Sequence, residues 1–372
     1  MRREFEAGGR PVDRTRLRDD TASRTSSLRR ICLKQEKVLA ALGRASAPMA
    51  IFVTGDGTAV PWGTACGMAD ASANRPLGVD TPLRVASNTK MFTAAAVLRL
   101  WEQGRIDLDA SIASVATPSL IAVLQAGGYR TESMTVRQLM NHSAGLYDHG
   151  DAPSFMQTVL NDPSHHWTRD EQVRLSARYA GPQSEPGARF QYSDTGYVLL
   201  GDIVERATGE TLAAVVRNAL RFDARGLRST WWELIEQPPS HAEPRARQFY
   251  GDIEMTDVNA TMDLYGGGGL VMSARDLASL AADLFEGRVF DNPQTLAEML
   301  KADAHEGADA YRLGVFVSEI GGAVCYSHAG FWGTVVYYVP RHRIAVSGVT
   351  TARGARPELE SIIETAIDEL GR

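Results

Sequence analysis

The sequence predicts an α/β layer domain that is interrupted by a helical insertion. Segments with the pattern of strands occur near the start, within residues 49–68, and return after about residue 308. Helical segments dominate the stretch between them, and no repeat period or low-complexity tract is evident. We therefore expect a flexible basic leader over residues 1–30, a sheet domain formed by residues 31–104 and 308–372, and a mainly helical insertion over residues 105–307.

The first elements are predicted from apolar periodicity and from the glycines that interrupt it. Apolar side chains between Leu28 and Leu42, Leu39 among them, share one helical face, and Gly43 ends that helix. Glycines also mark the turn after the first strand and the end of a strong helix at Gly104. The expected elements are a helix over 28–42, strands over 49–53 and 58–68, an extended piece over 82–85 and a helix over 89–103.

The later elements follow from the same signals. One helix is expected to begin after Ser273, whose Ser-x-x-Asp spacing to Asp276 is typical of a helix N-terminus, and to stop at Gly287. The other helices expected in the insertion cover residues 135–144, 195–208 and 211–222. After the insertion we expect strands over 311–317, 323–326, 334–339 and 344–349, and a final amphipathic helix over 357–370.

The composition is that of an ordinary globular protein. Of 372 residues, 44% are hydrophobic and 23% are charged, which excludes wholesale disorder. The formal net charge of −6 argues against a nucleic-acid partner, which would need a concentrated basic face. Three widely spaced cysteines, Cys32, Cys66 and Cys325, form neither a disulfide framework nor a zinc site, and they favour a reducing compartment. We expect no metal and no cofactor.

The N-terminal region shows no targeting signal. Residues 1–30 hold nine arginines and five acids without an apolar run, whereas a secretory signal needs about 7–15 consecutive apolar residues. The two longest uncharged stretches, residues 110–129 and 320–340, are interrupted by polar residues or glycines and do not predict a membrane span. We expect a soluble, cytoplasmic protein, with a mis-assigned start codon as an alternative explanation of the leader.

Ser87-Asn88-Thr89-Lys90 is the first indication of chemistry. Residues three apart share a helix face, so Lys90 is expected beside the Ser87 hydroxyl. The free N–H groups of a helix start favour an anion that forms at Ser87. A lysine, unlike an arginine, can lose its proton and so activate a serine, and Lys90 is one of only four lysines among 39 basic residues. On this motif alone, a capping serine beside a solvated lysine is the simpler alternative.

Two later segments supply the other candidate residues. Tyr192 is either a packed aromatic or a phenol that shuttles protons, with its pKa of about 10 lowered by the Lys90 charge. Asp194 is either the N-cap of the following helix or a site residue. His328 and Gly330 end a predicted strand, where a histidine is either an ordinary hairpin residue or part of a site. A glycine in a strand often marks a close approach of the backbone to a ligand.

With these motifs in this order, the chain resembles the serine penicillin-recognising enzymes. The branch it resembles contains class C β-lactamases, D-alanyl-D-alanine carboxypeptidases, esterases and D-amino-acid amidases or aminopeptidases. The resemblance covers about residues 31–370 and rests on four segments: Arg84-Val-Ala-Ser-Asn-Thr-Lys-Met-Phe-Thr, Leu139-Met-Asn-His-Ser-Ala-Gly-Leu, Tyr192-Ser-Asp-Thr-Gly-Tyr and Gly267-Gly-Gly-Leu-Val-Met-Ser-Ala-Arg-Asp-Leu. It implies an α/β (α+β) fold in which both chain ends build an antiparallel sheet flanked by helices, with a helical insertion domain.

The resemblance also implies roles for individual residues. Ser87 would be the acylated nucleophile of a serine hydrolase that cleaves an amide or an ester, and Lys90 and Tyr192 would handle protons. The backbone N–H groups of Ser87 and Phe331 would form an oxyanion hole, at roughly 3 kcal/mol per donor. The residues expected to bind a small-molecule or peptide substrate are Asp194, His328, Gly330 and Phe331.

Two residues depart from the family pattern. Asp194 replaces the usual asparagine and, when ionised, can only accept hydrogen bonds, so it would hold Lys90 protonated or receive a substrate ammonium group. His328 replaces the lysine typical of class C β-lactamases, and a neutral imidazole attracts a carboxylate less than an ammonium does. Both changes favour a peptidase, amidase or esterase over a β-lactamase. A catalytically weak penicillin-binding or sensor domain is the other alternative.

Two further motifs are interpreted as structural. Gly266–Gly269 lacks the Gly-Lys-Ser/Thr of a phosphate loop and is expected to form a tight turn near the cleft. The polar cluster of His142, Asp148, His149 and Asp151 lacks convincing metal-ligand spacing and is attributed to loop polarity.

Overall fold

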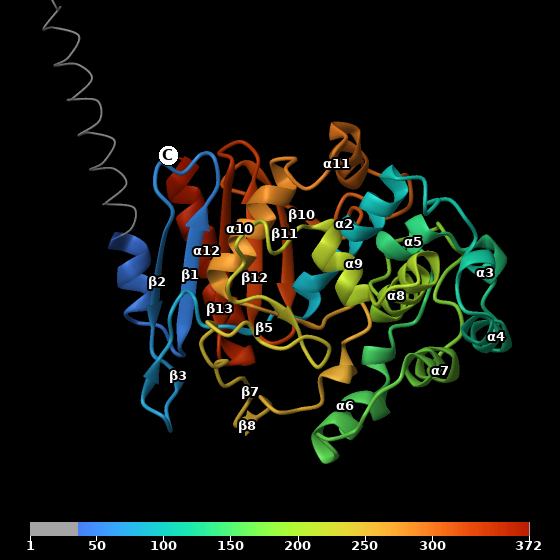
Figure 1. Ribbon diagram of the computed structural model, residues 1–372, viewed down its shortest axis with the longest axis horizontal. Coiled ribbons are helices and arrows are strands. Elements are labelled where there is room, and N and C mark those ends of the chain that lie inside the picture. The colour runs from blue at the N-terminus through green and yellow to red at the C-terminus, as the bar shows by residue number, and fades with distance from the viewer. Residues whose placement is uncertain (1–35, 372) are drawn as a thin grey trace, which may run out of the picture.

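A six-stranded antiparallel sheet forms one part of the protein, and helices pack against it (Figure 1). The computed structural model describes residues 36–371. The last four strands of the chain pair with its first two, which confirms that both chain ends build one sheet. In spatial order the strands are β10 (Phe316–Ile320), β11 (Ala323–Gly330), β12 (Thr334–Val339), β13 (Ile344–Thr350), β1 (Met49–Thr54) and β2 (Trp62–Cys66).

Alternate residues of β1 belong to two apolar cores, because successive side chains of a strand point to opposite faces. The core on one face contains α2 (Thr89–Glu102) and α10 (Ala274–Phe285). The core on the other face contains α12 (Arg356–Gly371) and the helical residues 36–42. Although α10 lies within the segment expected to be the insertion, it packs against β1, β12 and β13. The division into a sheet domain and an insertion stays a prediction.

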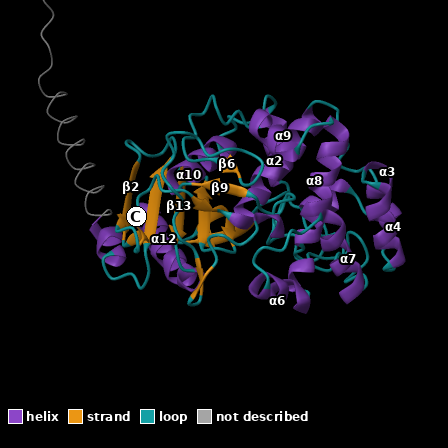
Figure 2. Ribbon diagram, turned by 60° about the horizontal axis from the view of Figure 1, so that its bottom comes forward, coloured by secondary structure: helices purple, strands orange, loops and turns teal. Residues whose placement is uncertain are grey.

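Most of the other helices lie together on one side of the sheet (Figure 2). Helix α2 joins the two parts, since it packs against α8, α9 and α11 and is buried from Thr89 to Leu100. The remaining helices are α3 (Ile112–Val115), α4 (Pro118–Ala126), α5 (Val136–Met140), α6 (Pro153–Asn161), α7 (Arg169–Tyr179), α8 (Asp194–Thr208), α9 (Leu212–Ala219) and α11 (Pro293–Leu300). Short strands pair as β3 (Met68–Asp70) with β4 (Arg75–Pro76), β9 (Leu270–Met272) with β5 (Leu83–Arg84) and β6 (Trp231–Trp232), and β7 (Phe249–Tyr250) with β8 (Ile253–Glu254).

The strand expected over 323–326 continues to Gly330 as β11. Two other strand predictions are wrong in their bounds, each because of a glycine in a left-handed conformation. The strand expected over residues 58–68 is two strands, since Gly67 has a φ of 76° and β3 pairs with β4 instead of β1. The strand expected from Tyr311 begins only at Phe316, because Gly314, with a φ of 87°, turns the chain between them.

The first 35 residues lie outside the described part of the chain, and so do the predicted leader and Cys32. Val38 and Leu42 are buried against the sheet, as expected for one face of the first helix. Leu39 is 48% exposed, however, because it lies about 100° around the helix from Val38. Within residues 36–371, no helix has the length and apolar character needed to cross a bilayer.

Candidate active site

Ser87 lies in the single 3₁₀ turn that leads from β5 into α2. Ala86, just before it, has a φ of 45°, in the left-handed region where a residue other than glycine is strained. The Asn88 side chain donates to Val85 O at 2.9 Å and to Thr334 Oγ1 at 2.7 Å on β12. The hydroxyl of Ser87 is therefore held at the junction of the sheet and the helices.

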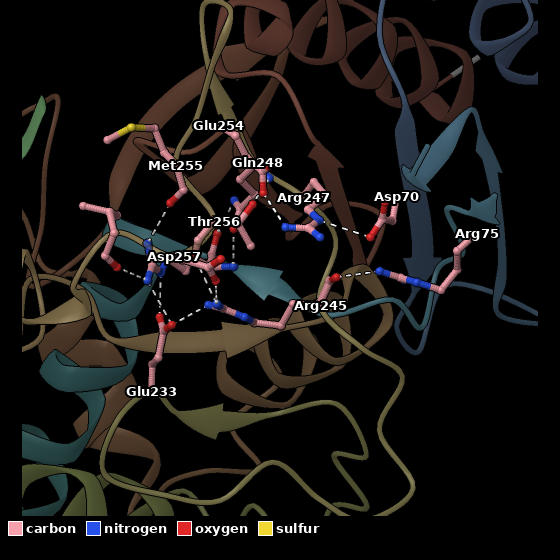
Figure 3. A network of polar contacts seen from close by, with 12 residues as sticks. Asp70, Arg75, Glu233, Arg245, Arg247, Gln248, Glu254, Met255, Thr256 and Asp257 are labelled. Atoms are coloured by element: carbon pink, nitrogen blue, oxygen red, sulfur yellow. Dashed lines mark hydrogen bonds and ion pairs between the residues drawn. The ribbon is translucent and has the colours of Figure 1, made fainter. Parts of the chain in front are cut away.

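Arg84 is buried and joins this turn to a network of polar contacts around Glu233 (Figure 3 labels Glu233 and its neighbours). Its guanidinium bonds to both carboxylate oxygens of Glu233, at 2.6 Å and 3.0 Å. The Gln248 side chain accepts from Arg84 N and donates to Arg84 O, which clamps the backbone of the strand. Glu233 also pairs with Arg245, as Figure 3 shows. The network fixes the strand three residues before Ser87.

Lys90 supplies the group that faces the Ser87 hydroxyl. Its side chain is fully buried, and Nζ lies 2.9 Å from Ser87 Oγ, 2.8 Å from Gly267 O and 2.5 Å from Asp194 Oδ1. The Ser87 hydroxyl and the Gly267 carbonyl each accept a hydrogen bond from Nζ, and the Asp194 carboxylate forms an ion pair with it. The Gly266–Gly269 turn thus lies at the site, as expected.

Tyr192 lies beside this group, with its ring centroid 5.2 Å from Lys90 Nζ, and its phenol interacts with Ser87 and Asp194. Burial, and then the negative charge of Asp194, raise the pKa of its phenol well above the usual value. The prediction that Lys90 lowers this pKa is wrong, because Asp194 neutralises the lysine at 2.5 Å and burial penalises a phenolate. Tyr192 therefore keeps its proton in the free site.

Asp194 is the first residue of α8, and Ser193 occupies the N-cap position. Burial alone would raise the pKa of Asp194, but the charge and hydrogen bond of Lys90, together with His149 and His142, outweigh it and keep that pKa below its usual value. The two side chains therefore form an ammonium–carboxylate pair, one of the two arrangements expected for an aspartate at this position.

Gly330 brings the end of β11 against the nucleophile turn. A Cβ at this position would lie 2.2 Å from Val85 O and 3.0 Å from Asn88 Nδ2, so a larger residue does not fit. The close approach expected at Gly330 is thus to the chain's own backbone, not to a ligand. Phe331, the next residue, and Ser87 both line a cavity of about 260 Å³.

A fold of this kind, with a buried lysine beside a serine at the start of α2, matches a known family. The family model named Beta-lactamase covers residues 36–367. The chain belongs to the Beta-lactamase family. The structure brings Ser87 and Lys90 together, and the roles that the resemblance implied for Ser87, Lys90 and Tyr192 stay predictions.

The names of similar proteins and structures indicate different substrates. Esterase EstB of Burkholderia gladioli is 36% identical over 184 residues, 48% of this chain and 45% of the esterase. A D-stereospecific amidohydrolase from Streptomyces sp. superposes with a TM-score of 0.75 at 25% identity, over 90% of this chain and 97% of that one. The D-amino acid amidase of Ochrobactrum anthropi SV3 shares the fold, with a TM-score of 0.73 at 22% identity over 91% and 98% of the two chains. The chain spans about half the length of the curated relatives it matches.

Among the described residues that line this cavity, His328 is absent. Its imidazole is buried, with Nε2 3.1 Å from the Tyr311 hydroxyl and Nδ1 3.0 Å from Ala329 N. Burial, together with the Lys90 charge, lowers the pKa of His328 to about 3. The ring is therefore neutral at physiological pH, and it contacts Tyr311 instead of the cavity.

This neutral histidine predicts a pH-dependent contribution to stability. The unfolded chain binds a proton at His328 below about pH 6.5, whereas the folded chain does not until about pH 3. As the pH is lowered from 6 to 4, we expect the free energy of unfolding of the wild type to decrease, relative to that of His328→Gln, by about 1.4 kcal/mol per pH unit. Urea unfolding of both proteins at several pH values measures this difference, and a constant difference across the range would contradict it.

The cavity is lined by several polar residues that the sequence analysis did not assign to the site. These are Asp148, His149, Asp151, Asp263 and Arg353. Attributing the 142–151 cluster to loop polarity is wrong, because Asp148 and His149 are 7% and 3% exposed. The close spacing of these acids and histidines in the sequence was a signal for a site. The spacing does not show, however, that their side chains are buried. For Asp263 there was no such signal. Within residues 36–371, no group of side chains has the arrangement of a metal site.

Proposed function

We propose that the protein is a serine hydrolase that cleaves an amide or an ester through an acyl-enzyme at Ser87. The observation that carries this proposal is that Ser87 Oγ, on the cavity wall, accepts a hydrogen bond from the buried Lys90 Nζ, with the Tyr192 ring 5.2 Å from the same amine. An esterase and a D-stereospecific amidohydrolase among the similar proteins support it. The residues Asp194 and His328 favour a D-amino-acid amidase, peptidase or esterase over a β-lactamase.

In the proposed mechanism, Ser87 Oγ attacks the substrate carbonyl carbon while its proton leaves through Tyr192. In this mechanism the phenol accepts the Ser87 proton as its own proton passes to Asp194, the two side chains with which it interacts. A free phenolate, which burial penalises, then never accumulates. The proton returns along the same path to the leaving amine or alkoxide, whose bond to the carbonyl carbon breaks. Water repeats the sequence on the acyl-enzyme and releases the acid.

The charge that develops on the carbonyl oxygen needs donors that are already in place. We assign this role to the backbone N–H groups of Ser87 and Phe331, which the fit of Gly330 against Val85 keeps close together. The Lys90 ammonium lies within 2.9 Å of Ser87 Oγ and favours negative charge on the reacting oxygen. His328 contacts Tyr311, neither residue lines the cavity, and His328 does not touch the substrate in this proposal.

Covalent labelling tests the nucleophile directly. We expect a fluorophosphonate probe, or a fluorescent penicillin, to add its mass to the peptide that contains Ser87, because both reagents acylate or phosphonylate an activated serine. Mass spectrometry of the digested protein locates the label, with Ser87→Ala as the control. A label that persists in Ser87→Ala, or no label on the wild type, would remove the enzyme proposal. Labelling without turnover of any ester or amide would favour the sensor alternative.

We also propose that the substrate is a small molecule or a peptide and that the protein works in the cytoplasm. The described cysteines, Cys66 and Cys325, are both free, which suits a reducing compartment. The net charge of −6 gives no support to a nucleic-acid partner.

A further inference from the structure

Tyr192 lies in a short segment that has no regular secondary structure of its own. Residues 191–193 belong to neither a helix nor a strand, and α8 begins only at Asp194. The proposed mechanism needs the Tyr192 phenol beside Ser87, and a displacement of about 1 Å in a reacting group can cost roughly 10²-fold in rate. Contacts from outside the segment therefore have to fix this side chain.

His142 holds this segment on both sides of Tyr192. Its backbone carbonyl accepts from Gln191 N at 2.7 Å, and its ring Nδ1 accepts from Ser193 N at 3.2 Å. The imidazole also packs on the Tyr192 ring, with 4.3 Å between the ring centroids and 36° between the planes. One residue therefore contacts the backbone before Tyr192, the backbone after it and the ring itself.

The position of His142 is itself well defined. Its φ is 58°, in the left-handed region that histidine, asparagine and aspartate enter more readily than other side chains do. The residue is 2% exposed, and its ring centroid lies 5.2 Å from that of Tyr197 and 4.8 Å from that of Tyr311. This packing fixes the imidazole in the orientation that faces residues 191–193.

The protonation state of His142 suits the bond to Ser193. Burial, and then the Lys90 charge, lower the pKa of His142 well below its usual value, so the ring is neutral at physiological pH. Because Nδ1 uses its lone pair to accept from Ser193 N, the proton of the neutral ring is on Nε2. Within residues 36–371, this buried Nε2 has no hydrogen-bond partner. The polar contribution of the ring is therefore its Nδ1 acceptor.

We propose that His142 is a positioning residue, which holds the Tyr192 phenol beside Ser87 by binding the backbone on either side of Tyr192. This inference rests on the proposed function, because Tyr192 acts there on the Ser87 proton. Among the described residues that line the cavity, His142 is absent, so it acts on the reaction through Tyr192 and not by contact with the substrate. Its loss should therefore lower kcat and leave KM nearly unchanged.

The first test removes the Nδ1 acceptor and then restores it. We expect His142→Leu to lower kcat on p-nitrophenyl butyrate by about 10- to 100-fold, with KM within about 3-fold of the wild-type value. His142→Asn should keep kcat within about 3-fold, because its amide oxygen is as many bonds from the backbone as Nδ1 and asparagine tolerates the left-handed conformation. Equal losses of kcat in the two variants, wild-type kcat in both, or a loss confined to KM would overturn the proposal.

A double-mutant cycle shows whether His142 acts through the phenol. In the Tyr192→Phe background, adding His142→Leu should lower kcat by less than about a further 2-fold, whereas losses that multiply would overturn the proposal. If leucine prevents folding, His142→Gln takes its place, because its amide oxygen lies one carbon further from the backbone than Nδ1. Asn74→Leu is the matched control, since the exposed Asn74 also has a left-handed φ, of 49°, and lies outside the cavity lining.

The control and covalent labelling separate the possible failures. Asn74→Leu should keep the wild-type kcat, and a loss equal to that of His142→Leu would overturn the proposal by attributing the effect to backbone strain in general. If a fluorophosphonate labels Ser87 of the wild type while the His142 results fail, the hydrolase stands and only the role of His142 is wrong. Without labelling of Ser87, the proposed function itself fails.

Discussion

Replacing Lys90 by methionine is expected to abolish useful turnover. Methionine fills a similar volume in the fully buried site, but it removes the charge 2.9 Å from Ser87 Oγ. We expect kcat/KM on a p-nitrophenyl ester to fall by roughly 10²–10⁴-fold, because proton handling and electrostatic stabilisation both depend on the amine. Steady-state kinetics and the rate of fluorophosphonate labelling measure the loss.

The same replacement should destabilise the fold, since it leaves the Asp194 carboxylate without its partner. Asp194 is 30% exposed to the cavity, so we expect a loss of about 2–3 kcal/mol, less than for a fully buried pair. The double variant Lys90→Met/Asp194→Asn removes the unpaired charge and should recover most of this stability. If the double variant also recovered activity, Lys90 would have only a structural role.

The layered fold could be predicted because its signals are local. Residues 334–339 were expected as a strand from their apolar residues alone, and β12 has these bounds. Gly104 marked the end of α2, which stops two residues before it. The bounds that failed depend on tertiary structure: Gly67 ends a strand only because β3 finds β4 as its partner. Likewise, nothing in the sequence of α10 indicates that it covers the large sheet.

The same distinction applies to the candidate site, where some features follow from local sequence signals and others depend on tertiary structure. The contact between Ser87 and Lys90 follows from a spacing of three residues across the 3₁₀ turn and the start of α2, and the structure has it at 2.9 Å. The raised pKa of Tyr192 and the neutral state of His142 depend instead on burial and on which charges surround each group. Such properties arise when distant segments meet, so a motif identifies the residue but not its protonation state.

Gly330→Ala is expected to have the second large effect, although it adds only a methyl group. The added Cβ would lie 2.2 Å from Val85 O and 2.3 Å from Thr334 Oγ1, so β11 or the nucleophile turn must move. Phe331 N, a proposed oxyanion donor, follows Gly330 directly and would move with it, so we expect kcat to fall by roughly 10²–10³-fold, as for the loss of one oxyanion donor. Overpacking should also lower the free energy of unfolding by about 1–3 kcal/mol.

Gly354→Ala is the matched control for this effect. A Cβ at Gly354 meets no atom within 4 Å, so the free energy of unfolding should stay within about 0.5 kcal/mol of the wild-type value. Ester hydrolysis and thermal unfolding of the two variants separate strain at the nucleophile from the general effect of an extra methyl group. A folded Gly330→Ala protein with the wild-type kcat would show that the oxyanion hole does not depend on the contact between β11 and Val85. A large loss in kcat with only modest destabilisation is the result that this geometry requires.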